Sequence, residues 1–209
     1  MEFERGDHEP RWPAIVAIVV IMGLRFVLPS ALSVGPDWLL AAVVAALLIP
    51  ASIFHQQRAY RLNQIFGYLI LALITADMIT SLALLIARLP SHRETPRQLL
   101  VAAAGLWGTN VLLFASWYWR LDAGGPNARD RRERHEDGAF LFPQMQLRDD
   151  EDWKPGFVDY LFLAFNTSTA FSPTDVPVLS RWAKLMMMVQ ASISLGSVVI
   201  LAGRAVNIL

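Results

Sequence analysis

The sequence contains no cysteine among its 209 residues. This absence excludes disulfide bonds, thiolate catalysis, and iron–sulfur or thiolate zinc sites. The four histidines, His8, His55, His92 and His135, all fall in tails or loops between apolar stretches. A membrane b-type haem needs imidazoles that face each other within a helical bundle. We therefore expect no cofactor, no metal site and no ordinary enzymatic activity.

Charged residues are scarce, at 17% of the chain, whereas apolar residues make up 55%. The mean hydropathy of +0.40 is high for a soluble domain. The 18 basic and 18 acidic residues balance, so the excess of positive charge that nucleic-acid binding requires is absent and no nucleic-acid partner is expected. These values predict an integral membrane protein whose main partner is the lipid bilayer.

Five apolar stretches are candidates for membrane spans, each of which needs about 20 mostly apolar residues. They cover approximately residues 13–32, 38–54, 65–87, 99–119 and 178 to the C-terminus. A sixth apolar stretch, "FVDYLFLAFNTSTAF" from Phe157, is too short to cross a bilayer. The pattern predicts an all-α, polytopic membrane bundle of about five transmembrane helices plus one short re-entrant, pore-like helix before the last span.

The chain divides into three regions by composition. Residues 1–12 form a polar N-terminal tail, and residues 13–98 form a three-helix transmembrane region. Residues 99–209 contain an outer helix, a charged linker (120–155), the re-entrant segment (156–177) and the last transmembrane helix. The linker is too short for a domain with its own core. The tail mixes acids with arginines, unlike a signal peptide, so we expect the first span to be retained.

Two residues of opposite charge lie well inside the first and third predicted spans, where charges are rare and often functional. Arg25 belongs to the first span and Asp77 to the third. Both lie about the same number of residues from one membrane face, so they are predicted to form a pair. One interpretation is an ion pair that fixes helix packing. The other is a proton or cation site at Asp77, assisted by Thr80 and Ser81 on the same helical face.

The re-entrant segment ends in hydroxyl side chains, in the stretch "FNTSTAFSPTD" from Phe165. The C-terminal end of a helix carries a partial negative charge, which would attract cations toward these residues. The pore-loop candidates are Thr167, Ser168, Thr169, Ser172, Thr174 and Asp175.

This stretch resembles the pore module of tetrameric potassium channels, whose filter signature reads Thr-x-Thr-Thr-Val-Gly-Tyr-Gly-Asp. Thr167, Thr169 and Asp175 stand in matching positions, whereas Ser172 and Thr174 replace both filter glycines. The resemblance implies four subunits around an axis and monovalent cations as partners. A carbonyl-lined filter needs those glycines for its positive φ angles, so potassium selectivity by that mechanism is not expected.

The second half of the chain is also similar to a family of uncharacterised bacterial integral membrane proteins. The stretches that carry this resemblance are "RLDAGGP", "FLFPQM", "DYLFLAFNTSTAFSPTD" and "RAVNIL". It implies a multi-pass protein of the bacterial inner (plasma) membrane, without an established activity.

In the last span, Ser192 and Gly196 form a small-xxx-small pair that allows helices to approach closely. The alternative interpretation of Gly196 is a hinge for gating. Three hypotheses remain open for the whole chain. It is a channel-like protein that conducts cations, a small proton- or cation-coupled transporter that uses Asp77, or a structural membrane protein that transports nothing. The arginines favour a cytoplasmic N-terminus only weakly, whereas a potassium-channel-like loop faces outside.

Overall fold

The computed structural model describes residues 9–88, 95–131, 138–146, 153–169 and 176–205. These residues form an all-helical fold, in which the antiparallel bridge between Phe140 and Val178 is the sole β pairing of the described residues. The α-helices are α1 (Trp12–Val27), α2 (Asp37–Gln56), α3 (Tyr60–Arg88), α4 (Pro96–Leu121), α5 (Pro126–Asp130), α6 (Phe157–Thr169) and α7 (Arg181–Ala205). Short 3-10 turns lie at Ser30–Leu32, Asp122–Gly124 and Pro143–Gln146.

Four of these helices, α2, α3, α4 and α7, are long and apolar enough to cross a membrane. The helix α1 is also apolar but spans only 16 residues. It ends five residues before the predicted end of the first span, because Leu28 is extended and precedes Pro29. The prediction of a continuous helix over residues 13–32 is therefore wrong at its C-terminal end.

Local signals fix the ends of the central helix α4. Thr95 caps its N-terminus in a capping box with Gln98, and Pro96 occupies the first turn. At the other end, Ala123 and the glycines Gly124 and Gly125 all have positive φ angles, which no continued helix allows. This turn lies at the start of the predicted charged linker (120–155).

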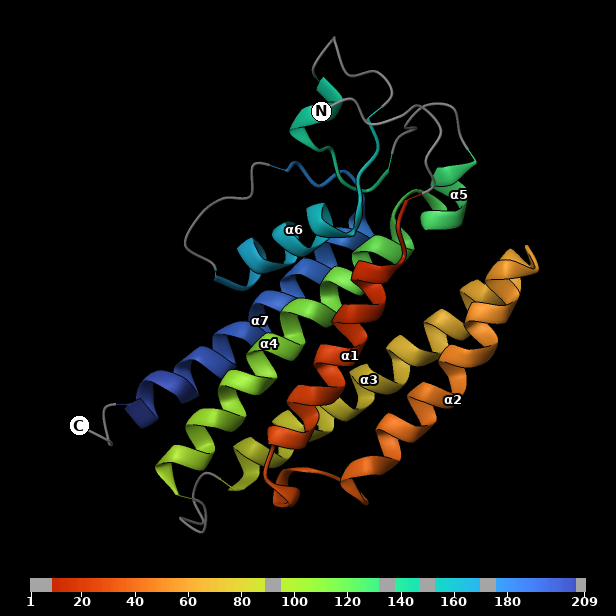
Figure 1. Ribbon diagram of the computed structural model, residues 1–209. Coiled ribbons are helices and arrows are strands. Elements are labelled where there is room, and N and C mark those ends of the chain that lie inside the picture. The colour runs from red at the N-terminus through yellow and green to blue at the C-terminus, as the bar shows by residue number, and fades with distance from the viewer. Residues whose placement is uncertain (1–8, 89–94, 132–137, 147–152, 170–175, 206–209) are drawn as a thin grey trace.

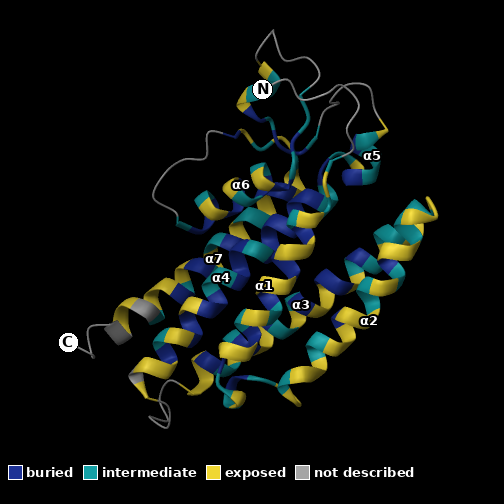
Figure 2. Ribbon diagram, viewed as in Figure 1, coloured by how far each residue is buried: buried dark blue, intermediate teal, exposed yellow. Residues whose placement is uncertain are grey.

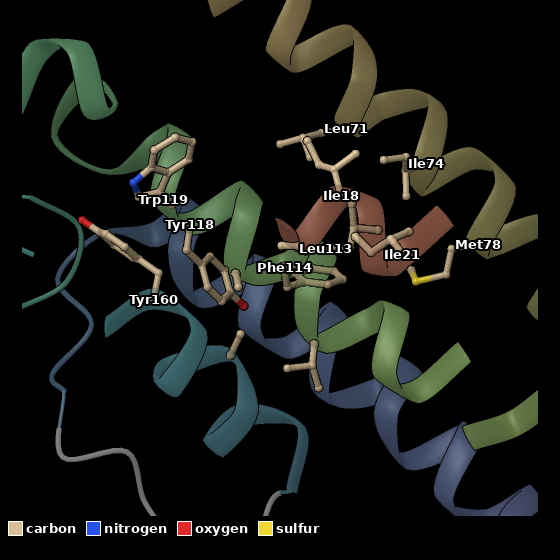
Figure 3. Packing of buried hydrophobic residues seen from close by; sticks show 14 of the residues in the cluster. Ile18, Ile21, Leu71, Ile74, Met78, Leu113, Phe114, Tyr118, Trp119 and Tyr160 are labelled. Carbon is tan, nitrogen blue, oxygen red and sulfur yellow. The ribbon is translucent and has the colours of Figure 1, made fainter. Parts of the chain in front are cut away.

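The helix α4 lies at the centre of the fold and contacts α1, α3, α6 and α7 (Figure 1). The α2–α3 hairpin packs on one side, and α7 runs alongside α4 on the other (Figure 1). Between α1, α3 and α4, the apolar core is continuous (Figure 3). Its labelled members there are Ile18, Ile21, Leu71, Ile74, Met78, Leu113 and Phe114.

The outer faces of the long helices expose large apolar side chains (Figure 2). Leu185, Met188 and Leu195 of α7, for example, are each more than 60% exposed. In water such a surface would favour aggregation. An apolar exterior on helices of this length fits a protein whose surroundings are lipid.

Candidate functional site

The short helix α6 is bound to the rest of the fold along one face. Tyr160, Leu163 and Ala164 are fully buried against α4 and α7, whereas Phe162 and Phe165 are exposed on the opposite face. At the start of α6, Phe157 meets the ring of Trp119 edge-on, with 5.8 Å between ring centroids. Since Trp119 lies in the last turn of α4, α6 begins at the end of the membrane-length helices.

The other end of α6 is fixed by Gln190 of α7, which is fully buried. Its side-chain Nε2 donates to the carbonyl oxygen of Ala164 at 2.7 Å and to the hydroxyl of Ser168 at 2.8 Å. Its Oε1 accepts a hydrogen bond from the hydroxyl of Tyr118 in α4 at 2.6 Å. One amide side chain thus joins α4, α6 and α7, and its hydrogen-bond partners Tyr118, Ala164 and Ser168 are uncharged.

Two further bonds extend this network. Ser194, one turn after Gln190, donates to the carbonyl oxygen of Ser168 at 2.5 Å. Asn110 of α4 donates to the backbone carbonyl of Gln190 at 3.2 Å, and its Oδ1 has no hydrogen-bond partner among the described residues. We call the set Gln190, Ser168, Ser194, Asn110 and Tyr118 the α6 anchor. Because burial makes unpaired polar groups costly, these bonds fix the last described turn of α6 against α4 and α7.

Three of the six predicted pore-loop residues lie in the described part of α6, and their side chains bond differently. Thr167 donates back to the carbonyl of Leu163 at 2.8 Å, and Thr169 donates to that of Asn166 at 3.1 Å. Ser168 alone of the described candidates contributes its side chain to the α6 anchor. The remaining candidates, Ser172, Thr174 and Asp175, lie outside the described residues.

Four members of the α6 anchor were not predicted from the sequence as site residues, namely Gln190, Ser194, Asn110 and Tyr118. The sequence did contain a signal, because Gln190, Ser194 and Ser197 follow i, i+4, i+7 spacing and so share one helical face. In the structure all three are buried. Polar residues on one face of an otherwise apolar span indicate a polar partner. The spacing does not indicate which helix supplies that partner.

Arg25 and Asp77, which were predicted to pair, are in contact. The Nε of Arg25 lies 2.9 Å from Oδ2 and 3.2 Å from Oδ1 of Asp77. Arg25 is 5% exposed and stands in the last turn of α1, where the helix dipole favours a cation. Asp37, at the start of α2, lies 3.9 Å from Arg25. The pair is therefore near the end of α1, not in the middle of the bundle.

A second polar cluster lies at the opposite end of α1, around Asp122. This residue is fully buried. Its Oδ2 accepts from the hydroxyl of Tyr160 at 2.6 Å, and its Oδ1 accepts from the backbone N–H of Ala139 at 2.5 Å. Buried Arg129 donates to the carbonyls of Trp119 and Asp122 at 2.8 and 2.9 Å. The start of the linker, predicted only as a charged connection, is thus folded against α4 and α6.

The N-terminal tail completes this cluster through Glu9. Glu9 accepts hydrogen bonds from the indole of Trp119 and from Arg129, the latter at 3.2 Å. Arg11 binds both Glu9 and Asp130. Burial raises the pKa of the Glu9 carboxyl, although Arg129, Trp119 and Arg11 all act in the opposite direction. The cluster therefore ties the tail to α4 and α5.

The small-residue pair of α7 does not contact another helix of the described chain. Ser192 is exposed and donates to the carbonyl of Met188 at 2.8 Å. A Cβ added to Gly196 would meet no described atom within 4 Å. The predicted close approach of helices at this pair is therefore not made within the described part of the chain.

Comparison of the chain with protein-family models, with curated proteins and with solved structures gives no match.

Proposed function

We propose that the chain is a subunit of a channel-like integral membrane protein, in which α4, α6 and α7 form a pore module that conducts cations. In this module α4 is the outer helix, α6 is a re-entrant half-helix, and α7 is the inner helix. The single observation that carries the proposal is the position of the two ends of α6. One end lies beside Trp119 and the other beside Gln190.

The depth of these ends follows from helix geometry. Gln190 comes nine residues after Arg181, the first residue of α7, which is about 14 Å along the helix axis at 1.5 Å per residue. Half of a hydrocarbon core of about 30 Å is about 15 Å. The 13 residues of α6 extend about 20 Å, too short for a span. These lengths support a half-helix that enters from one membrane face and ends near the midplane.

A half-helix that ends at this depth brings its partial negative charge to a low-dielectric region, where a cation is stabilised. The α6 anchor holds that end from two other helices, as a preorganised binding site requires. Because the filter glycines of potassium channels are replaced in this sequence, we propose a likeness of layout and not of ion selectivity.

A transporter that works through Asp77 is less well supported. Both carboxylate oxygens of Asp77 lie within 3.2 Å of the Arg25 Nε. An arginine this close favours the charged form of the carboxylate, which disfavours proton uptake, and it occupies the position that a transported cation would take. We therefore interpret the Arg25–Asp77 pair as a link between α1 and α3.

We propose a bacterial inner-membrane location, on the sequence resemblance, and an N-terminus in the cytoplasm. The end of the molecule at which α1 begins also carries the α2–α3 turn and α5 (Figure 1). Its arginines include Arg11, Arg58, Arg61, Arg129 and Arg131, whereas the α3–α4 connection carries Arg88, Arg93 and Arg97. Basic residues are more frequent in cytoplasmic loops. This orientation places α6 on the cytoplasmic side, opposite to potassium-channel pore loops.

The proposal is tested by measuring cation flux into proteoliposomes that contain the purified full-length chain. We expect flux above that of protein-free vesicles, a reduced flux in Thr169→Ala at the end of α6, and an unchanged flux in Asp77→Asn. Ser192→Ala is the matched control, because Ser192 is exposed on α7 and bonds only within its own helix.

The opposite pattern would favour the transporter, namely flux that survives Thr169→Ala and vanishes in Asp77→Asn. Absence of flux for every cation tested would favour a structural membrane protein. Native mass spectrometry of the same sample gives the subunit number, and a strict monomer would exclude a pore shared by four subunits.

A further inference from the structure

A cavity of about 590 Å³ opens between the start of α3 and the segment that contains α5. Figure 1 shows both elements at the end of the fold where α4 finishes, and a bilayer that α4 crosses would have one of its surfaces at this level. Its volume is typical of small-molecule sites. The side chains that carry the argument are Arg58, Arg61, Gln64, Arg120, Asn127 and Arg131, all of which line it.

The lining contains four arginines and no acidic residue. Arg58, Arg61 and Arg131 are exposed at the rim, and Arg120 is half-buried. None of the four forms an ion pair with a described acidic residue. Positive charge that no described carboxylate balances, in a concave and partly desolvated site, concentrates anions.

Arg120 is built into the cavity and does not simply reach it from the surface. Its guanidinium lies directly against Gly67 of α3, in the space that a Cβ on Gly67 would occupy. The Trp119 ring, whose centroid lies 5.5 Å from the Arg120 Cζ, offsets part of the hydration that this half-buried guanidinium loses. Because no described acidic residue pairs with Arg120, the rest of that loss is without compensation. A bound anion would supply that compensation.

Polar groups beside the arginines are bonded within the fold, so the guanidinium groups are the donors that an anion would meet. The Gln64 side chain already bonds to the hydroxyl of Tyr68 at 2.8 Å, and Arg131 is held by a bond from its Nε to the carbonyl of Asn127 at 3.1 Å. The planar guanidinium fork matches two oxygens of a phosphate or carboxylate, and arginine is the preferred residue for phosphate recognition.

We propose that this cavity binds a phosphate group. The two sources of that chemistry are the headgroup of an anionic phospholipid and a soluble phosphate compound. The position at the end of α3 and α4 favours the phospholipid, because basic pockets between membrane helices at this depth bind anionic headgroups. The site is separate from the α6 anchor and does not depend on the function proposed for it.

The test uses native mass spectrometry of the purified full-length chain, with phosphatidylglycerol or phosphatidylcholine added. We expect phosphatidylglycerol adducts in preference to phosphatidylcholine adducts. The double variant Arg58→Gln/Arg61→Gln should bind phosphatidylglycerol about 30-fold more weakly, a factor of roughly 5 for each arginine. Both residues are exposed, so this variant is expected to fold.

Arg181→Gln/Lys184→Gln is the matched control, since both residues are exposed at the start of α7 and neither lines the cavity. It should retain the affinity for phosphatidylglycerol. Gly67→Ala should weaken binding with all four arginines present, because it displaces the Arg120 guanidinium.

A second arm separates the two sources with inorganic phosphate alone. Phosphate that raises the Tm of the wild-type chain but not of Arg58→Gln/Arg61→Gln, without any lipid preference, would assign the site to a soluble phosphate compound. Equal adducts with both lipids and no stabilisation by phosphate would overturn the proposal. So would an equal loss of binding in the cavity variant and the Arg181→Gln/Lys184→Gln control, since the effect would then be general surface charge.

Discussion

The side-chain amide of Gln190 in α7 lies 2.8 Å from the hydroxyl of Ser168 in the last turn of α6. The same amide bonds to Ala164 and Tyr118, so three helices depend on one buried side chain. This relationship positions the last described turn of α6, and the proposed pore module depends on it.

Replacing Gln190 by leucine should loosen α6 and lower the stability of the protein. The change removes three side-chain hydrogen bonds, each worth about 0.6 kcal/mol in a membrane bundle, which gives about 2 kcal/mol in total. It also leaves the hydroxyl of Tyr118 buried without its partner. Thermal unfolding in detergent measures the effect as a lower Tm.

The control for this prediction is Ser192→Ala in the same helix, which should change the Tm little because Ser192 is exposed. An unchanged Tm in Gln190→Leu would mean that the α6 anchor contributes no stability. The position of α6 would then have to be set by its apolar face alone.

The ion pair between Arg25 and Asp77 is tested by a double-mutant cycle. Arg25→Ala alone leaves the partly buried Asp77 carboxylate without its guanidinium partner. Loss of one member of a buried pair costs about 3 kcal/mol. The double variant Arg25→Ala/Asp77→Ala should be more stable than Arg25→Ala, because no unpaired carboxylate remains at position 77.

Tm values of the wild type and of the three variants supply the coupling between the two residues. A double variant that is no better folded than Arg25→Ala would contradict the pairing as a source of stability. Asp37, which lies 3.9 Å from Arg25, would then be the more important partner.

The extent of the helices was largely predictable from the sequence, because apolar length is a local property. The second span was expected at residues 38–54, and α2 covers Asp37–Gln56. The first span was predicted too long, since Pro29 ends the helix although the apolar run continues beyond it. Hydropathy alone does not register a backbone restriction of this kind.

The polar contacts were predictable only in part. Two opposite charges within apolar spans indicate each other, so Arg25 and Asp77 could be identified as partners. A single neutral glutamine such as Gln190 carries no such indication of its partner. Asp122 belongs to the segment that was predicted to be a charged linker. Its burial depends on Tyr160 and Ala139, which are distant in the sequence and approach it only in the folded chain.

The glycine at position 138 is predicted to be essential for the cluster around Asp122. A Cβ on Gly138 would lie 2.5 Å from Oδ1 of Asp122. The Asp122 carboxylate cannot easily move away, because Oδ1 accepts a hydrogen bond from the Ala139 N–H and Oδ2 accepts one from the Tyr160 hydroxyl. Gly138→Ala should therefore destabilise the protein by about 1–3 kcal/mol, as overpacking of a well-packed site does. The measurement is again thermal unfolding.

Gly23→Ala is the matched control, because an added Cβ there meets no described atom within 4 Å. In the interior of α1 it should raise the stability by about 0.5–1 kcal/mol. Equal effects of the two substitutions would argue that Asp122 is not tightly enclosed.

The orientation of the protein can be determined by cysteine labelling, which is straightforward because the natural chain contains no cysteine. Gln57→Cys, in the exposed α2–α3 turn, should react with a membrane-impermeant maleimide only after the cells are permeabilised. Arg97→Cys, exposed at the start of α4 on the other side, should react in intact spheroplasts. The reverse pattern would place the N-terminus outside and α6 in the potassium-channel orientation.

The open face at Gly196 is predicted to be where subunits meet, if the chain assembles as the pore proposal requires. Leu195 and Val199 beside it are 63% and 61% exposed, and no described atom lies within 4 Å of a Cβ added to Gly196. Gly196→Leu should therefore leave the Tm of the isolated chain nearly unchanged. In native mass spectrometry it should reduce the oligomer, because a bulky side chain prevents the close helix approach that small residues allow. Leu195→Ala, which removes bulk at the same face, should leave the oligomer present. An oligomer that tolerates Gly196→Leu would show that this face contacts only lipid.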